Sequence, residues 1–144
     1  MKLPFEIDLK GKTAVVTGGG GVLCSMFAKA VAKTGAAVAV LDLNGEAAKK
    51  TADEINADGG TAIGIAANVL EKESLEAAKK TINEKFGTVD ILLNGAGGNN
   101  PKGTTTKDYF EIGDENAEGI KTFFDLDPAG VDFVFKLNFL GTLL

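Results

Sequence analysis

Four consecutive glycines stand where a backbone turn could bind a phosphate. Gly18–Gly21 follow the short apolar run 13–17 and precede Val22 and Leu23, which begin a stretch with helical spacing. Glycine has no Cβ, so the backbone of such a turn can approach a diphosphate closely. The unpaired N–H groups at the start of a helix also favour an anion. We expect a phosphate near residues 21–23; the alternative is a turn that only closes a tight strand–helix junction.

An acidic residue follows the glycines at a meaningful distance. Asp42 ends a second apolar run, 37–41, and an acid about twenty residues beyond a glycine turn accepts hydrogen bonds from an adenosine ribose. Its charge repels a 2′-phosphate, and the chain has no arginine to offset that charge. The glycine turn together with Asp42 therefore favours NAD over NADP. The alternative for Asp42 is the N-cap of the next helix.

Composition excludes several other kinds of chemistry. Fifteen lysines against twenty acidic residues give a net charge of -5, so we expect neither nucleic acid nor an anionic membrane as a partner. Without histidine, a Ser-His-Asp triad and histidine metal sites are excluded, and no metal is expected. We expect the single cysteine, Cys24, to be a small buried side chain that fills space in the core. Acids within residues 1–8 do not fit a signal peptide, so we expect a cytoplasmic protein.

Alternating strands and helices must position these residues. Apolar β-branched runs predict strands at 13–17, 37–41, 61–66 and 89–93. Apolar spacing predicts a helix that starts at 22 and is capped by Gly35, and further helices over 45–57 and 71–86. Strands joined by helical crossovers lie parallel, with helices on both faces. The prediction is an α/β protein with a doubly wound, Rossmann-like parallel sheet in three α/β/α layers, forming one domain over residues 1–144.

Residues 99–127 show neither the apolar spacing of a strand nor that of a helix. We expect them to form a long loop at the carboxyl end of the fourth strand. Open α/β sheets bind ligands at that end. Three lysines of this loop could attract a substrate carboxylate, although loop lysines are usually solvated; they are Lys102, Lys107 and Lys121. Asp127 and Pro128 predict the start of a nearly apolar helix. Such a helix needs cover, so we expect a homo-oligomer formed through it.

Four motifs, in this order, resemble the N-terminal half of the short-chain dehydrogenase/reductase family: Thr17–Leu23, Asp42, Asn94–Gly97 and Leu137–Gly141. The glycine turn and the segments 97–101 and 123–127 are also similar to the D-mannonate oxidoreductase (fructuronate reductase) branch. The resemblance implies hydride transfer between NAD and a secondary alcohol or ketone. The implied substrate is a sugar acid or polyol, D-mannonate or D-fructuronate.

The resemblance also implies roles for single residues. Asp42 would bind the ribose, Asn68 and Val69 would lie against the adenine, and Asn138 would be the catalytic asparagine that kinks its helix and holds a water. The residues alone favour another role for Asn138, a polar side chain that satisfies backbone inside an apolar helix. The remaining cofactor contacts would come from the glycine turn and the end of strand four: Gly18, Gly20, Gly21, Val22, Leu23, Asn94, Gly95, Ala96 and Gly97.

The family's proton donor has no counterpart in these residues. The family uses a Tyr with a Lys four positions later, together with a Ser, but Gly113 stands four residues after Tyr109, the single tyrosine. We expect an inactive N-terminal part of a longer enzyme, truncated within the helix that carries Asn138. Two alternatives are a non-catalytic dinucleotide-binding module or partner-dependent half-domain, and a flavodoxin-like domain without a nicotinamide cofactor.

Overall fold

A computed structural model describes residues 7–144; the expectation about an N-terminal leader falls largely on residues 1–6, which lie outside the described residues. The described chain forms two compact units, residues 7–96 and Gly97–Leu143. The expectation of a single domain stays a prediction.

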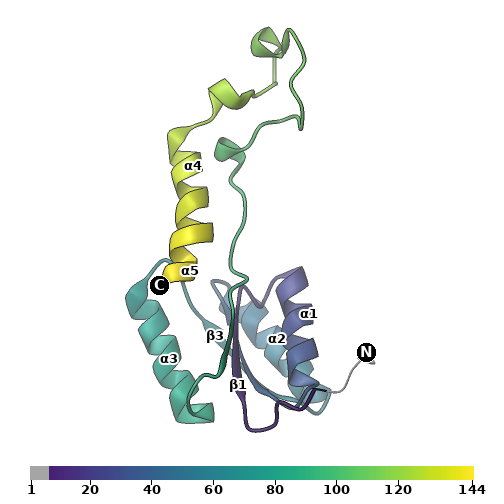
Figure 1. The fold of residues 1–144 in the computed structure, drawn as a ribbon, viewed down its shortest axis with the longest axis vertical. Coiled ribbons are helices and arrows are strands. Elements are labelled where there is room, and N and C mark those ends of the chain that lie inside the picture. Colours follow the sequence, from purple (N-terminus) through teal and green to yellow (C-terminus); the bar gives the residue numbers. More distant parts are fainter. Residues whose placement is uncertain (1–6) are drawn as a thin grey trace. The chain divides into compact units, whose positions relative to one another are not determined.

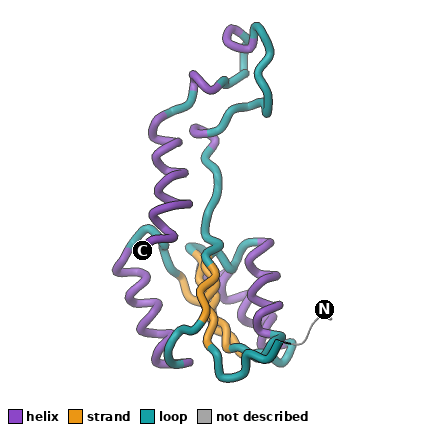
Figure 2. Tube along the Cα trace, viewed as in Figure 1, coloured by secondary structure: helices purple, strands orange, loops and turns teal. Residues whose placement is uncertain are grey.

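The first unit is built on a parallel four-stranded sheet (Figure 2). Its strands are β1 (Thr13–Thr17), β2 (Ala37–Asp42), β3 (Thr61–Ala66) and β4 (Ile91–Leu93), in the order β3-β2-β1-β4. Val15 lies opposite Ala39 on one side and Leu92 on the other. The predicted doubly wound α/β class is therefore confirmed.

Strand β4 begins two residues later than the predicted 89–93. Just before it, the Asp90 carboxylate accepts the Thr13 N–H at 2.9 Å and pairs with Lys12 at 2.8 Å. These bonds lower the pKa of Asp90, the Lys12 bond most strongly. The Asp90 N–H also donates to the Thr13 oxygen at 2.9 Å, so bonding to β1 starts at Asp90 and the regular strand starts at Ile91.

Helices cover both faces of the sheet (Figure 1). They are α1 (Val22–Ala32), α2 (Gly45–Ala57) and α3 (Lys72–Phe86). The first two bury Val16, Val38 and Val40 on one face, and α3 packs on the other face, whose core includes Ala39 and Leu41. The apolar spacing of the sequence therefore predicted the correct layers.

The carboxyl edge of this sheet is where a site can form. Successive strands add to one side of β1 through β2 and β3, and β4 then lies on its other side. A reversal of strand order of this kind is the place where open α/β sheets bind ligands, at the carboxyl ends of the strands. The glycine turn follows β1, Asp42 ends β2, and Asn94 follows β4, so the predicted residues share this edge.

The second unit contains a long irregular segment and a helix. Single turns of 3₁₀ helix interrupt the segment at Pro101–Gly103, Asp114–Asn116 and Phe123–Asp125. Helix α4 (Pro128–Phe135) starts at the predicted cap, where Asp127 accepts the Ala129 N–H at 2.9 Å. It continues through a π-helical stretch, Lys136–Leu140, into α5 (Gly141–Leu143).

A glycine contact joins the two parts of this unit. A Cβ on Gly130 of α4 would lie 2.4 Å from the backbone nitrogen of Gly103, so only glycine permits this approach. Helix side chains beyond it remain uncovered: Phe135 and Phe139 are 67% and 65% exposed. Among residues 7–144, no helix is long and apolar enough to cross a membrane, and no group of three or more potential metal ligands occurs there.

Candidate functional site

The glycine turn is tight because its backbone runs against two neighbouring loops. Gly18 has a φ of +66°, and a Cβ there would lie 2.8 Å from the Gly95 oxygen. A Cβ on Gly20 would lie 2.6 Å from the Ala47 side chain and 3.0 Å from the Asp42 carboxylate. Close packing alone therefore requires glycine at positions 18 and 20, independently of any ligand.

Hydrogen bonds fix this turn before any ligand is present. The Gly19 N–H donates to the Leu41 oxygen at 2.9 Å, and the Gly20 N–H donates to Asp42 Oδ2 at 3.0 Å. From α2, the buried Thr51 hydroxyl donates to the Gly19 oxygen at 3.0 Å. The sequence analysis missed Thr51, because a threonine on a helix gives no sign that it bonds a distant turn.

Thr51→Val tests this bond. Valine keeps the shape but leaves the buried Gly19 oxygen without its donor, so we expect the free energy of unfolding to fall by about 1–3 kcal/mol. Thr61→Val on the exposed edge of β3 is the matched control, with an expected change within about 0.5 kcal/mol. Urea unfolding measures both variants, and equal stabilities would contradict the role given to Thr51.

The first turn of α1 presents free backbone donors. Its N-cap, Gly21, has no side-chain acceptor, and the first backbone bond at this end runs from Ser25 N–H to the Gly21 oxygen at 2.9 Å. Within residues 7–144, the N–H groups of Val22, Leu23 and Cys24 have no acceptor. Val22 is 82% exposed. A helix start of this kind can bind an anion such as a diphosphate.

Asp42 faces the glycine turn with part of its hydrogen-bonding capacity unused. Besides the Gly20 N–H, its carboxylate accepts the Asn44 N–H at 2.9 Å. The N-cap of α2 is Asn44, whose side chain accepts from Ala47 N–H at 3.2 Å, so the alternative that Asp42 caps this helix is wrong. A carboxylate has about four acceptor positions, which leaves Asp42 free to accept from two ribose hydroxyls.

Asn68 and Val69 follow β3 at the same edge. The Ala67 N–H donates to the backbone oxygen of Asp42 at 2.9 Å, which places this segment beside the end of β2. Asn68 Oδ1 accepts the Leu70 N–H at 3.0 Å and its Nδ2 donates to Glu71 at 2.8 Å. Val69 is buried. The amide oxygen keeps one lone pair, so its predicted contact with adenine stays a prediction.

The end of β4 is tied to the end of β1. Thr17 Oγ1 accepts from the N–H groups of both Gly95 (3.0 Å) and Ala96 (3.1 Å), a link that the sequence analysis also missed. Asn94 is exposed at this edge. Cys24 is buried, which confirms the expected filler, and burial together with the Asp42 charge raises the pKa of its thiol.

In the second unit, the side-chain amide of Asn138 is hydrogen-bonded to backbone groups. Its Oδ1 accepts the Gly98 N–H at 3.0 Å, and its Nδ2 donates to the Gly98 and Val134 oxygens, both at 2.8 Å. Gly97 lies under this amide, since a Cβ there would be 2.5 Å from Oδ1. Both amide hydrogens are used, as the residues alone suggested; the water-holding role stays a prediction.

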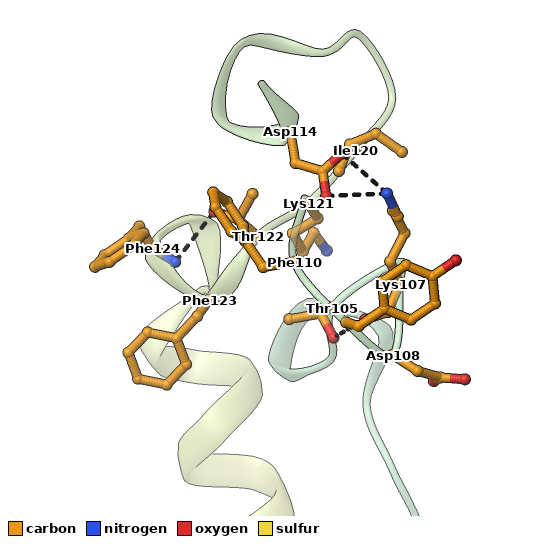
Figure 3. Close-up of a pocket in the computed structure, with 11 residues that line it drawn as sticks. Thr105, Lys107, Asp108, Phe110, Asp114, Ile120, Lys121, Thr122, Phe123 and Phe124 are labelled. Carbon is orange, nitrogen blue, oxygen red and sulfur yellow. Dashed lines mark hydrogen bonds and ion pairs between the residues drawn. The ribbon is translucent and has the colours of Figure 1, made fainter. Parts of the chain in front are cut away.

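A cavity of about 280 Å³ in the second unit is lined by four aromatic residues together with threonine, lysine, aspartate and isoleucine side chains (Figure 3). Lys107 lines it and pairs with Glu111 and, at 3.0 Å, with Asp114. The bond to Glu111, followed by that to Asp114, raises the pKa of Lys107. Lys121 donates to the Pro101 oxygen at 2.7 Å and Lys102 pairs with Asp127 at 3.6 Å. A substrate carboxylate would therefore have to displace existing partners.

The parallel sheet, with the glycine turn and Asp42 at its carboxyl edge, is typical of α/β proteins that bind dinucleotides. Sequence comparison gives the family. The family model for short chain dehydrogenase matches residues 12–144. The chain belongs to the short-chain dehydrogenase family.

Several relatives share this sequence closely. An uncharacterized oxidoreductase of Haemophilus influenzae is 51% identical over all 144 residues, which cover 50% of that protein. The uncharacterized oxidoreductase UxuB of Bacillus subtilis is 47% identical over 99% of this chain and 50% of its own length. A Haemophilus crystal structure with bound NAD, provisionally named a D-mannonate oxidoreductase, has 51% identity and a TM-score of 0.89 over 95% of this chain and 48% of that chain. The chain thus spans about half the length of these relatives.

Proposed function

We propose that this chain supplies the dinucleotide-binding half of an NAD-dependent oxidoreductase that interconverts a secondary alcohol and a ketone. The observation that carries the proposal is the first turn of α1, where three N–H groups have no acceptor among residues 7–144. They lie next to a glycine turn that Asp42 and Thr51 already hold in place. When bound, NAD would supply the hydride acceptor.

The residues at the glycine turn and at the end of β2 leave space and free hydrogen-bonding groups for NAD. Diphosphate oxygens would accept from the amides of Val22 and Leu23, because the exposed Gly21 before them places no side chain in the way. Asp42 would accept from the adenosine ribose and repel a 2′-phosphate. Asn68 and Val69 would border the adenine. The remaining proposed contacts are Gly18, Gly20, Asn94, Gly95, Ala96 and Gly97.

The proposed substrate is a sugar acid or polyol, with D-mannonate and D-fructuronate first. Support comes from the Haemophilus structure provisionally named a D-mannonate oxidoreductase, which is 51% identical. Asn138 is proposed as a positioning residue: by holding Gly98 through two hydrogen bonds it would fix the chain that leaves the dinucleotide site.

Calorimetric titration of the 144-residue polypeptide tests the proposal. We expect NAD to bind more tightly than NADP and FMN not to bind, because Asp42 disfavours a 2′-phosphate. The same polypeptide should not oxidise D-mannonate, since it has no Tyr-x-x-x-Lys pair to move the proton. Tighter binding of FMN than of NAD would favour the flavodoxin-like alternative, and sustained NADH production would contradict the expected inactivity.

We also propose that the apolar helix over 128–143 pairs with a second copy of the chain. Its uncovered aromatic side chains, including Phe135 and Phe139, support this. A half-domain that needs a partner chain accounts for the same exposure. A cytoplasmic location stays a prediction.

A further inference from the structure

Gly95, the second residue after β4, lies in a slot formed by the junction between β1 and α1. Its N–H donates to Thr17 Oγ1 at 3.0 Å, and its oxygen lies 3.7 Å from Cys24 Sγ. The same oxygen would be 2.8 Å from a Cβ on Gly18. Both backbone polar groups of Gly95 therefore face the junction, although the residue as a whole is exposed.

The slot has no room for a side chain, and Cys24 is the main reason. A Cβ on Gly95 would lie 2.2 Å from Cys24 Sγ and 2.9 Å from the Thr17 oxygen. Atoms this close must move apart. Cys24 is 9% exposed and belongs to the core that also holds Val16 and Ala28, so its sulfur cannot simply swing into solvent. The thiol fills the volume that Gly95 leaves empty.

This packing reaches the proposed diphosphate site through α1 itself. Cys24 lies in the first turn of that helix, and its own N–H is one of the three free donors. Its side chain contacts the exit of β4, so the size of that side chain sets the separation between the helix start and the strand end. A change in this separation moves all three amides together, because a helical turn shifts as a unit.

We propose that Cys24 is a positioning residue of the dinucleotide site, matched in size to Gly95. The inference rests on the proposed function of the glycine turn and adds a residue that acts through the helix start. It makes no use of thiol reactivity: Cys24→Ala removes the volume of the sulfur together with its weak S–H···O contact to the Gly95 oxygen.

A double-mutant cycle with Cys24→Ala and Gly95→Ala tests the match. Gly95→Ala alone should lower the Tm by roughly 5–10 °C, since it overpacks the slot. Adding Cys24→Ala removes the sulfur from the 2.2 Å contact, so we expect the double variant to regain about half of that loss or more. If Gly95→Ala alone does not fold, a folded double variant is the expected result.

Gly60→Ala provides the matched control. Its Cβ would lie 2.7 Å from Ile55 Cγ2, a clash of similar kind that does not involve Cys24. Combined with Cys24→Ala, it should give nearly additive changes in Tm, because the atoms nearest to this Cβ belong to Ile55 and Ala32 and not to Cys24. Rescue of Gly60→Ala by Cys24→Ala would mean a general effect of the smaller residue and would overturn the proposal.

NAD affinity separates positioning from simple stability. Measured well below the Tm, Cys24→Ala should raise the Kd for NAD roughly three- to tenfold, because misplaced donors bind less well. An unchanged Kd in a folded variant, or purely additive Tm losses in the Cys24/Gly95 cycle, overturns the inference. If the unchanged chain binds no NAD, the proposed function fails instead, while the Tm cycle still decides whether the two residues are matched.

Discussion

Asp42→Asn is expected to weaken NAD binding by roughly 10- to 100-fold and to remove most of the preference for NAD over NADP. Hydrogen bonds to a charged acceptor contribute about 1.5–3 kcal/mol, and 1.4 kcal/mol is a factor of ten in affinity. The neutral amide accepts fewer hydrogen bonds from the ribose and no longer repels a 2′-phosphate. Titrations of both dinucleotides against both proteins give the two ratios.

The matched control is Asp53→Asn on the exposed side of α2. Among the residues that the structure describes, Asp53 pairs only with Lys49, at 2.5 Å, on the same helix, so its neutralisation should leave both dissociation constants unchanged. Unfolding of Asp42→Asn must be measured as well, because Asp42 also holds the Gly20 and Asn44 N–H groups. A folded Asp42→Asn protein with the original preference for NAD would show that the ribose lies elsewhere.

The sequence was informative wherever a local pattern determines structure. Residues 13–17, 45–57 and 61–66 adopt the predicted bounds, because β-branched runs and amphipathic spacing between glycines leave one compatible assignment. The start of β4 was wrong by two residues: Asp90 bonds Thr13 through both its side chain and its backbone N–H, but the regular strand begins only at Ile91. The π-helical stretch over 136–140 had no signal beyond the kink that the family resemblance implied at Asn138.

Long-range partners of the candidate site could not be predicted from spacing. Thr51 bonds a residue 32 positions earlier and Thr17 bonds one 78 positions later, and both look like ordinary strand or helix threonines in the sequence. Cys24 was expected only as a buried filler and Gly95 as a cofactor contact, yet the two fill one slot together. Such pairs become visible only when the topology brings β1 and β4 side by side.

Gly18→Ala is expected to cause the largest loss of stability at the candidate site. The left-handed backbone of Gly18, with a φ of +66°, costs a non-glycine residue about 1–2 kcal/mol. The new Cβ would also lie 2.8 Å from the Gly95 oxygen and 2.9 Å from Ala96 backbone atoms, which adds about 1–3 kcal/mol of overpacking. Urea unfolding should therefore show a loss of about 2–5 kcal/mol.

Gly11→Ala separates the two causes of that loss. Gly11 has a similar φ of +75°, but apart from its chain neighbours a Cβ there meets no atom of residues 7–144 within 4 Å, so only the left-handed backbone cost of about 1–2 kcal/mol applies. Gly18→Ala should also displace the end of β4 from the glycine turn and weaken NAD binding at least roughly tenfold, whereas Gly11→Ala should leave the affinity intact. Equal losses of stability in the two variants would mean that the close approach of Gly18 to Gly95 does not constrain the folded protein, and the junction would then have to be looser than these distances imply.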